Sequence, residues 1–130
     1  MRAAIRPATL LAVAALAIAD AVAAEPILSP GFRFSEQTGE ALYSNACQAC
    51  HMANGEGALG AGQYPSLARN PKLEAAAYAT HIVLHGHKAM PAMGRLMTDE
   101  QVAAVVNHIR MHFGNGYKNA VTADEVKKAR

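Results

Sequence analysis

The stretch Cys47-Gln48-Ala49-Cys50-His51 (CQACH) holds the only two cysteines of the 130-residue sequence, and a histidine directly follows the second one. Two thiols at this spacing lie about one helical turn apart, so each can form a thioether with a vinyl group of the same porphyrin. The next residue then places an imidazole beside the iron. This C-x-x-C-H pattern is typical of a c-type haem attachment site. We therefore predict one covalent haem c at Cys47 and Cys50, with His51 as an axial iron ligand.

A pair of cysteines at this spacing has three alternative uses: a zinc site, a redox pair and a disulfide. A structural zinc site usually takes four protein ligands, and no third or fourth cysteine is present. A thioredoxin-like redox pair would require a βαβ pattern and a reactive thiolate, whereas no segment alternates polar and apolar residues with the period of a strand. A simple disulfide between Cys47 and Cys50 is the remaining alternative.

The first 24 residues have the pattern of a secretory signal peptide. Two arginines begin it, residues 8–19 are apolar, and small residues precede the expected cleavage after Ala24 or Ala23. A retained membrane anchor would need about 20 apolar residues, and Asp20 ends the apolar stretch well short of that length. We predict export to the periplasm, which agrees with covalent haem attachment because that reaction takes place outside the bacterial cytoplasm.

Length and charge restrict the class of the exported chain. Removing the signal leaves about 106 residues, enough for one domain. The whole sequence has a formal net charge of +2, and it contains no stripe of basic residues interleaved with aromatic ones, as nucleic-acid binding would favour. No apolar run after the signal is long enough to span a membrane. We therefore expect no nucleic-acid partner and no stable membrane insertion after cleavage.

The residues around the motif predict a helix between two irregular segments. Residues 25–34 contain two prolines and a glycine, which predicts an irregular leader. Ser35 is the expected N-cap of a first helix that runs into the CQACH motif. Four glycines between positions 55 and 62 then predict a loop without regular structure up to Pro65. The haem motif is thus expected at the end of a helix.

A second helix is expected to start at Asn70-Pro71, where a capping residue precedes a proline at the first helical position. Gly86 is expected to end it. Residues 85–97 contain two glycines and a proline and predict a loop.

Two more helices are expected from capping boxes. Thr98 and Gln101 form one box, and the apolar residues that follow it recur at helical spacing as far as Phe113. Thr122 and Glu125 form a weaker box before a short basic helix. All predicted elements are helices, so the expected fold class is all-α.

Together these features resemble the class I cytochromes c, with the similarity covering residues 35–113. Gly39-x-x-x-Tyr43 is similar to the family's small and aromatic pair, which lets the first helix cross the last at close range. The family usually has an aliphatic and an aromatic residue on the last helix, and these positions match Val105 and His108. The histidine departs from the pattern, and we interpret it as a partly buried structural residue.

The resemblance implies short helices wrapped around one covalent haem and a domain organisation to match. We expect a signal peptide at residues 1–24, an irregular leader at 25–34 and a cytochrome c domain at 35–116. Residues 117–130 would then form a C-terminal extension with a short helix.

The resemblance also implies the groups that hold the iron. The His51 ring should donate from its other nitrogen to a backbone carbonyl, and the family pattern assigns that carbonyl to Pro65. Met90 precedes a proline, so its backbone is extended, and Met-Pro at this distance from the haem motif matches the family's sixth ligand. Met93 is the nearest competitor, interpreted as packing in the haem pocket. The other candidates within reach in sequence are Met97, His81, His85 and His87.

An iron with both axial positions filled can change oxidation state but cannot readily bind a substrate. The first hypothesis is therefore a periplasmic electron carrier that takes one electron from a dehydrogenase and passes it to an oxidase or another cytochrome. The second is a tightly bound cytochrome subunit of a periplasmic alcohol- or aldehyde-type dehydrogenase, which residues 64–71 and 113–115 resemble. The third is a haem enzyme or sensor with an open sixth position, for which no acid–base pair stands out.

Overall fold

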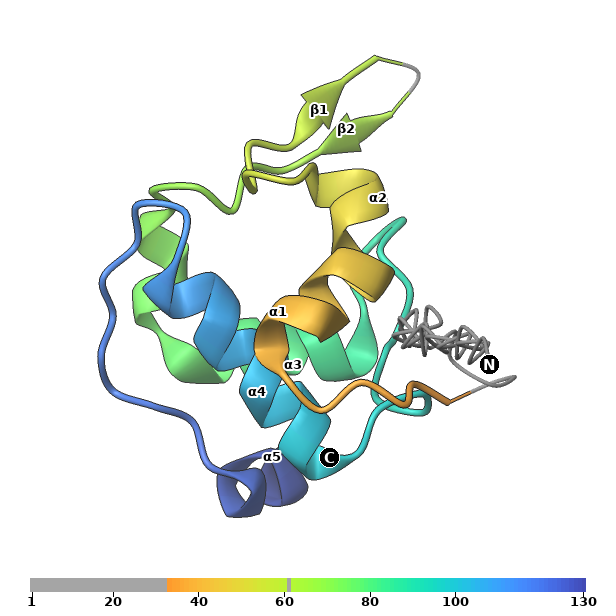
Figure 1. Cartoon of the computed structure of the whole chain (residues 1–130), viewed down its shortest axis with the longest axis vertical. Coiled ribbons are helices and arrows are strands. Elements are labelled where there is room, and N and C mark those ends of the chain that lie inside the picture. Colours follow the sequence, from red (N-terminus) through yellow and green to blue (C-terminus); the bar gives the residue numbers. More distant parts are fainter. Residues whose placement is uncertain (1–32, 61) are drawn as a thin grey trace, which may run out of the picture.

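The computed structural model describes residues 33–60 and 62–130, and it is an assembly of short helices (Figure 1). The predicted signal peptide and all but the end of the predicted leader lie outside the described residues. The elements in chain order are α1 (Gly39–Leu42), the π-helix η1 (Tyr43–Cys47), α2 (Gln48–His51), β1 (Ala58–Leu59), β2 (Gln63–Tyr64), the 3-10 helix η2 (Pro71–Glu74), α3 (Ala76–His85), α4 (Asp99–Met111) and α5 (Ala123–Ala129).

The first helical segment begins later than the sequence predicts. Thr38 is the N-cap, and its hydroxyl accepts a hydrogen bond from the Ala41 amide at 3.2 Å. The prediction of Ser35 as the cap is wrong, because residues 34–37 are not helical and a distant side chain binds their backbone. The Gln101 side-chain amide donates to the carbonyls of Phe34 at 2.9 Å and Glu36 at 2.8 Å. From Thr38 the chain stays helical through α1, η1 and α2 into the motif.

The glycine-rich segment contains a small hairpin where no regular structure was predicted. Strands β1 and β2 pair antiparallel, with Ala58 opposite Tyr64 and Leu59 opposite Gln63. In Figure 1 the hairpin projects from the helical part of the molecule. Each strand is only two residues long, so the described fold remains that of an all-α protein, as predicted.

The Asn70-Pro71 start signal is confirmed, but the helix it begins is divided. The Asn70 side chain accepts from the Lys72 amide at 3.0 Å, and η2 follows as a 3-10 turn. Ala75 is extended, with ψ 96°, and separates η2 from α3. The prediction of one continuous helix is therefore wrong in its first turn. Gly86 ends α3 with φ 73°, as predicted.

Both predicted capping boxes are present. Thr98 and Gln101 exchange hydrogen bonds at the start of α4, and Thr122 and Glu125 do so at the start of α5. The hydrogen bonds from Thr122 lower the pKa of the Glu125 carboxyl, because they stabilise its charged form. The short helix expected within residues 117–130 is thus α5.

The crossing of α1 and α4 forms the centre of the core. A Cβ on Gly39 would collide with the carbonyl oxygen of Ala104, so only glycine permits this approach. Tyr43 is buried, with its ring 4.7 Å from the ring of Phe113 and 5.6 Å from that of His108. His108 is partly buried beside Tyr43, as interpreted from the sequence. Burial, followed by the neighbouring His112, lowers the pKa of His108.

None of the helices within the described ranges has both the length and the apolar character needed to cross a membrane.

Candidate functional site

The three residues of the motif lie on one continuous helical stretch. Cys47 ends η1, and Cys50 and His51 lie in α2. Both cysteines have free thiols, with Cys47 partly buried and Cys50 exposed. The two thiols and the imidazole therefore come from consecutive turns that the chain forms locally.

The acidity of the Cys47 thiol argues against a redox-active dithiol. Burial, with a further contribution from Cys50, raises the pKa of Cys47 to about 11. Reactive cysteines of the thioredoxin type need a lowered pKa, because the thiolate is the nucleophile. At neutral pH the Cys47 thiol is protonated, unlike the thiolate that a disulfide-exchange centre needs.

The His51 ring is buried and held in one orientation. Its exposed fraction is 8%, and Nδ1 donates to the carbonyl oxygen of Pro65 at 2.9 Å. The hydrogen bond that the family resemblance implies is therefore present. Because Nδ1 carries the proton, the Nε2 lone pair is the one left for a metal.

The loop after the motif brings Pro65 to this position. The Gly57 amide donates to the His51 carbonyl at 3.0 Å, and Gly57 has φ 69°. A Cβ there would collide with the carbonyl oxygen of Tyr64. Further along, the amides of Leu67 and Ala68 both donate to the Gly55 carbonyl. The glycines thus let the chain return beside α2 and present Pro65 to His51.

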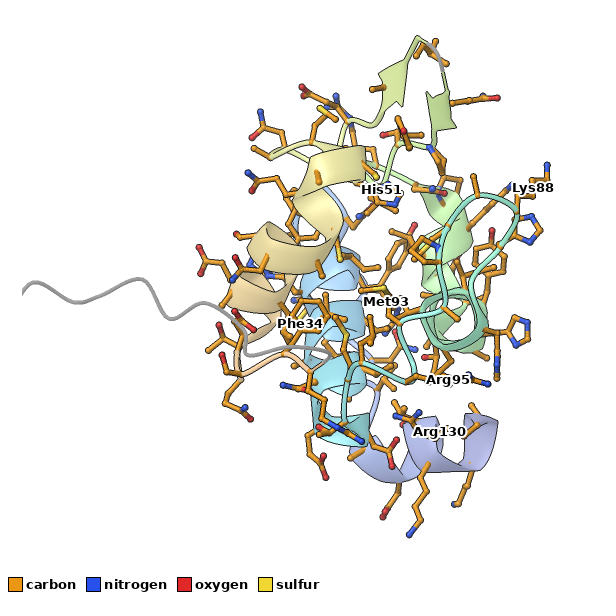
Figure 2. The ribbon with its side chains drawn as sticks, turned by 90° about the vertical axis from the view of Figure 1, so that its right-hand side faces the viewer. Phe34, His51, Lys88, Met93, Arg95 and Arg130 are labelled. Carbon is orange, nitrogen blue, oxygen red and sulfur yellow. The ribbon has the colours of Figure 1, made fainter. Side chains whose placement is uncertain are left out.

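The methionine loop, residues 86–93, lies between α3 and α4 and carries Met90 and Met93. Met90 is partly buried, and its amide and carbonyl both pair with His87, at 2.9 and 3.1 Å. Met93 is buried, and its amide donates to the Val83 carbonyl at 2.9 Å. Figure 2 shows His51 and Met93 in the interior of the molecule, with Lys88 at its periphery.

The remaining candidate ligands divide clearly by exposure. Met97 is buried in the core, whereas His81, His85 and His87 are exposed. The three histidines therefore lie on the surface of the described part of the molecule. The assignment of Met90 over Met93 remains a prediction.

Two side chains that support this region were missed at the sequence level. Asn115 binds the carbonyls of Leu67 and Ile109, both at 2.8 Å, and accepts from the Asn70 amide at 2.9 Å. It therefore ties the segment after Pro65 to the end of α4. Its place between two glycines indicated only a helix end.

Arg110 is the second missed residue and is completely buried. Its guanidinium donates to the carbonyls of Leu73, Glu74 and Asn119 and to the side chain of Asn119. The only sequence signal was a charge beside the apolar face of α4.

The donor set fits a c-type haem. It comprises two free thiols one helical turn apart, a buried imidazole with Nε2 available, and the thioethers of Met90 and Met93 on the loop between α3 and α4. Among the described residues, no group of three or more His, Cys, Asp or Glu side chains could hold a metal ion. The zinc alternative therefore finds no ligand set in this part of the chain.

Comparisons with known proteins show which family and which relatives the chain is similar to. Residues 35–109 match the family model for cytochrome c oxidase, cbb3-type, subunit III. The chain is 39% identical over 109 residues to the gluconate 2-dehydrogenase cytochrome c subunit of Pantoea cypripedii, a match covering 72% of this chain and 24% of that protein. It is 34% identical over 107 residues to the fructose dehydrogenase cytochrome subunit of Gluconobacter japonicus, covering 71% and 22%.

A match over most of both chains is found with cytochrome c-552 of Thermus thermophilus. The identity is 32% over 124 residues, which cover 80% of this chain and 82% of that protein. By contrast, the chain spans about a quarter of the length of the two dehydrogenase subunits.

Proposed function

The chain belongs to the class I cytochrome c family, whose cofactor is covalently bound haem c, and from this premise we propose that it is a one-electron carrier with His51 and Met90 as axial ligands. The observation that carries the proposal is the geometry of His51. It is buried, follows two free cysteines, and donates from Nδ1 to the Pro65 carbonyl at 2.9 Å. This hydrogen bond leaves Nε2 as the nitrogen for the iron.

Each residue of the site has a defined task in this proposal. Cys47 and Cys50 would hold the haem by two thioether bonds, and His51 would bind its iron through Nε2. Met90, on the loop between α3 and α4, would supply the second ligand. When bound, the haem supplies the one-electron Fe(III)/Fe(II) couple, and a thioether opposite an imidazole raises the reduction potential. With both axial positions filled by side chains, the protein transfers electrons without binding a substrate at the iron.

The second candidate function is an electron-transferring subunit of a larger dehydrogenase. It is supported by the similarity to cytochrome subunits named for gluconate and fructose dehydrogenases. Both functions use the same site and differ in whether the partner stays bound. In both we propose a periplasmic location, a dehydrogenase as donor, and an oxidase or another cytochrome as acceptor.

The test is a spectrum and an intact mass of the purified holoprotein. We expect the haem to stay with the polypeptide in acid acetone and the mass to exceed that of the polypeptide by one haem. The oxidised protein should show the weak near-infrared band of an iron–methionine bond. Haem that extracts freely, or a Cys47–Cys50 disulfide in protein matured with haem, would contradict the proposal.

Co-purification separates the two candidate functions. The chain is tagged and isolated from its native host under mild conditions. A free carrier elutes alone, whereas a subunit elutes with a larger flavin-, quinone- or molybdenum-containing protein in constant ratio.

A further inference from the structure

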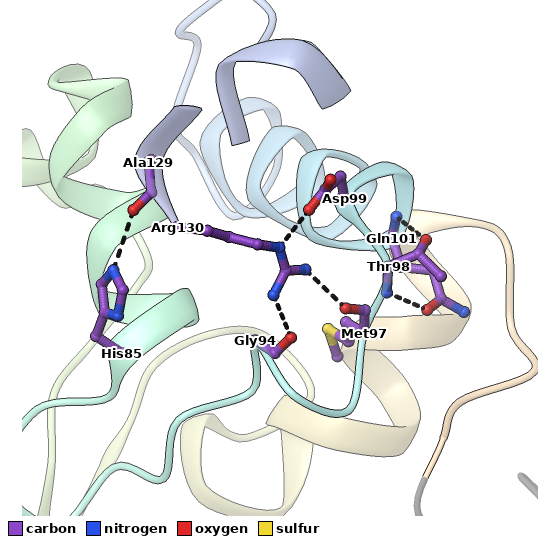
Figure 3. Close-up of polar contacts among 8 residues, drawn as sticks. All are labelled: His85, Gly94, Met97, Thr98, Asp99, Gln101, Ala129 and Arg130. Carbon is purple, nitrogen blue, oxygen red and sulfur yellow. Dashed lines mark hydrogen bonds and ion pairs between the residues drawn. The ribbon is translucent and has the colours of Figure 1, made fainter. Parts of the chain in front are cut away.

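The turn at residues 94–97 leads from the methionine loop into α4. Arg130, the residue that follows α5, contacts this turn. Helix α5 is anchored by Val126, which is completely buried in the core. At its end, the His85 ring donates from Nε2 to the Ala129 carbonyl at 3.1 Å, which ties α5 to the end of α3. The next residue, Arg130, therefore projects from a docked helix (Figure 3).

The Arg130 guanidinium binds both ends of this turn and the first residue of α4. Nε donates to the Asp99 carboxylate, and the two terminal nitrogens donate to the carbonyl oxygens of Gly94 and Met97. The Met97 contact is 2.9 Å long. Figure 3 shows the three contacts diverging from one side chain toward the two ends of the turn. One planar cation thus joins the start of the turn, its end and the first residue of α4.

The same turn is also bonded to α3. The amides of Met93 and Gly94 donate to the carbonyls of Val83 and Leu84, at 2.9 and 3.2 Å. A Cβ on Gly94 would lie 2.7 Å from the Leu84 oxygen and 3.3 Å from the Arg130 guanidinium. The Gly94 backbone is therefore enclosed, with its amide bound to α3 and its carbonyl bound to Arg130.

We propose that Arg130 is a positioning residue for the methionine ligand, which keeps the methionine loop closed by holding Gly94 and Met97. The inference rests on the proposed function, because it concerns the loop assigned to carry the sixth ligand. A thioether binds iron weakly, so the fraction of time it stays bound depends on the loop around it. Losing the guanidinium leaves two carbonyls and a carboxylate without this partner and frees one side of the turn.

The expected effect is moderate because the Arg130 side chain is 36% exposed and competes with water. The affinity for added imidazole measures this effect, because imidazole binds ferric iron only when the methionine leaves. In the holoprotein, Arg130→Ala should raise the affinity for imidazole about three- to tenfold. The near-infrared band of the free protein should weaken. Amide hydrogen exchange at Met97 should accelerate.

Three variants serve as controls. Arg130→Lys keeps the charge but loses the planar fork, and should give an intermediate affinity. Asp99→Asn weakens one of the three contacts, and should also be intermediate. Lys127→Ala removes an exposed cation from α5, three residues before Arg130, and should leave the affinity unchanged. If Arg130→Ala does not accumulate as holoprotein, the Lys and Asn variants carry the test alone.

The outcomes separate this inference from the proposed function. A parent protein without the near-infrared band overturns the methionine ligation and this inference with it. A parent with the band, together with Arg130 variants whose imidazole affinity matches the parent, overturns only the inference. Arg130 variants with a lowered melting temperature but an unchanged imidazole affinity also overturn the inference, because Arg130 would then contribute only to overall stability. An equal rise in Lys127→Ala would assign the effect to net charge, which also overturns it.

Discussion

The two regions proposed to bind the iron are built in different ways. His51 lies in a helical stretch next to the proposed attachment points Cys47 and Cys50, and its orienting carbonyl, Pro65, is 14 residues away in the sequence. Met90 lies in a loop whose backbone is bonded to α3 and which leads into the turn that Arg130 binds. In this proposal, covalent and local bonds hold one ligand, whereas tertiary contacts hold the other. We therefore expect the methionine side to open first under any stress.

The largest effect should follow removal of both attachment points. Cys47→Ala combined with Cys50→Ala should lower the holoprotein yield about tenfold or more, because a cofactor that binds only the folded chain stabilises it. Intact mass and absorbance of the periplasmic fraction measure the yield. Each single variant should keep one thioether. A double variant that accumulates as stable holoprotein would show that the His51 side does not depend on covalent attachment.

The next effect concerns the choice of methionine. Met90→Ala should keep the covalent haem but lose the near-infrared band, lower the potential and bind carbon monoxide rapidly in the ferrous state. Met93 is 8% exposed, so Met93→Ala should keep the band and cost about 2 kcal/mol of stability through lost packing. Spectra and thermal melts of the two variants give the answer. Loss of the band in Met93→Ala but not in Met90→Ala would reverse the assignment.

Substitution of two glycines tests the His51 side and the Met90 side separately. Gly57 and Gly86 both have positive φ, and an added Cβ would meet the Tyr64 carbonyl in one case and the Met90 carbonyl, at 2.5 Å, in the other. Either change to Ala should cost about 2–4 kcal/mol. Gly86→Ala should also weaken the near-infrared band, whereas Gly57→Ala should not.

The matched control for this pair is Gly60→Ala. A Cβ at Gly60 would meet no atom within 4 Å, and its φ is outside the positive range. Melting temperature and band intensity should therefore match the parent. A weakened band in Gly57→Ala would mean that the two sides are coupled and would break the comparison.

The smallest effect is the pH dependence contributed by His108. Burial lowers its pKa below the usual 6.5, so between the two values the unfolded chain binds more protons than the folded one. This contribution to stability is present above pH 6.5 and is lost as the pH falls through the lowered pKa. We expect the melting temperature to fall from pH 7.5 to 5 by less in His108→Phe than in the parent. Equal slopes would contradict a role for His108.

His108 belongs to the His51 side of the molecule. Its ring packs against Tyr43, whose hydroxyl donates to the Met52 carbonyl at 2.6 Å. Burial, and then the nearby Cys47, raises the pKa of that hydroxyl to about 12, so it remains a donor over the whole range. Acidification to pH 5 should therefore leave the near-infrared band intact while the melting temperature falls.

Patterns confined to a few neighbouring residues were sufficient for much of the fold. The Thr98 and Thr122 capping boxes join residues three apart, and the Gly86 stop needs only a positive φ. The CQACH motif also needs no more than one helical turn. Such features are readable because the interacting groups are neighbours in the chain and need no distant partner.

Contacts between distant segments decided the rest. Gln101 holds the backbone at Phe34 and Glu36, more than 60 residues away, and so moves the start of the first helix from Ser35 to Thr38. Likewise, Arg130 reaches the turn at Gly94, 36 residues earlier. Side-chain amides and guanidinium groups can satisfy any carbonyl within reach, and only the packed fold determines which one that is. The sequence by itself thus determined the cofactor motif, the two capping boxes and the Gly86 stop, whereas the tertiary structure decided where the first helix begins and how the methionine loop is held.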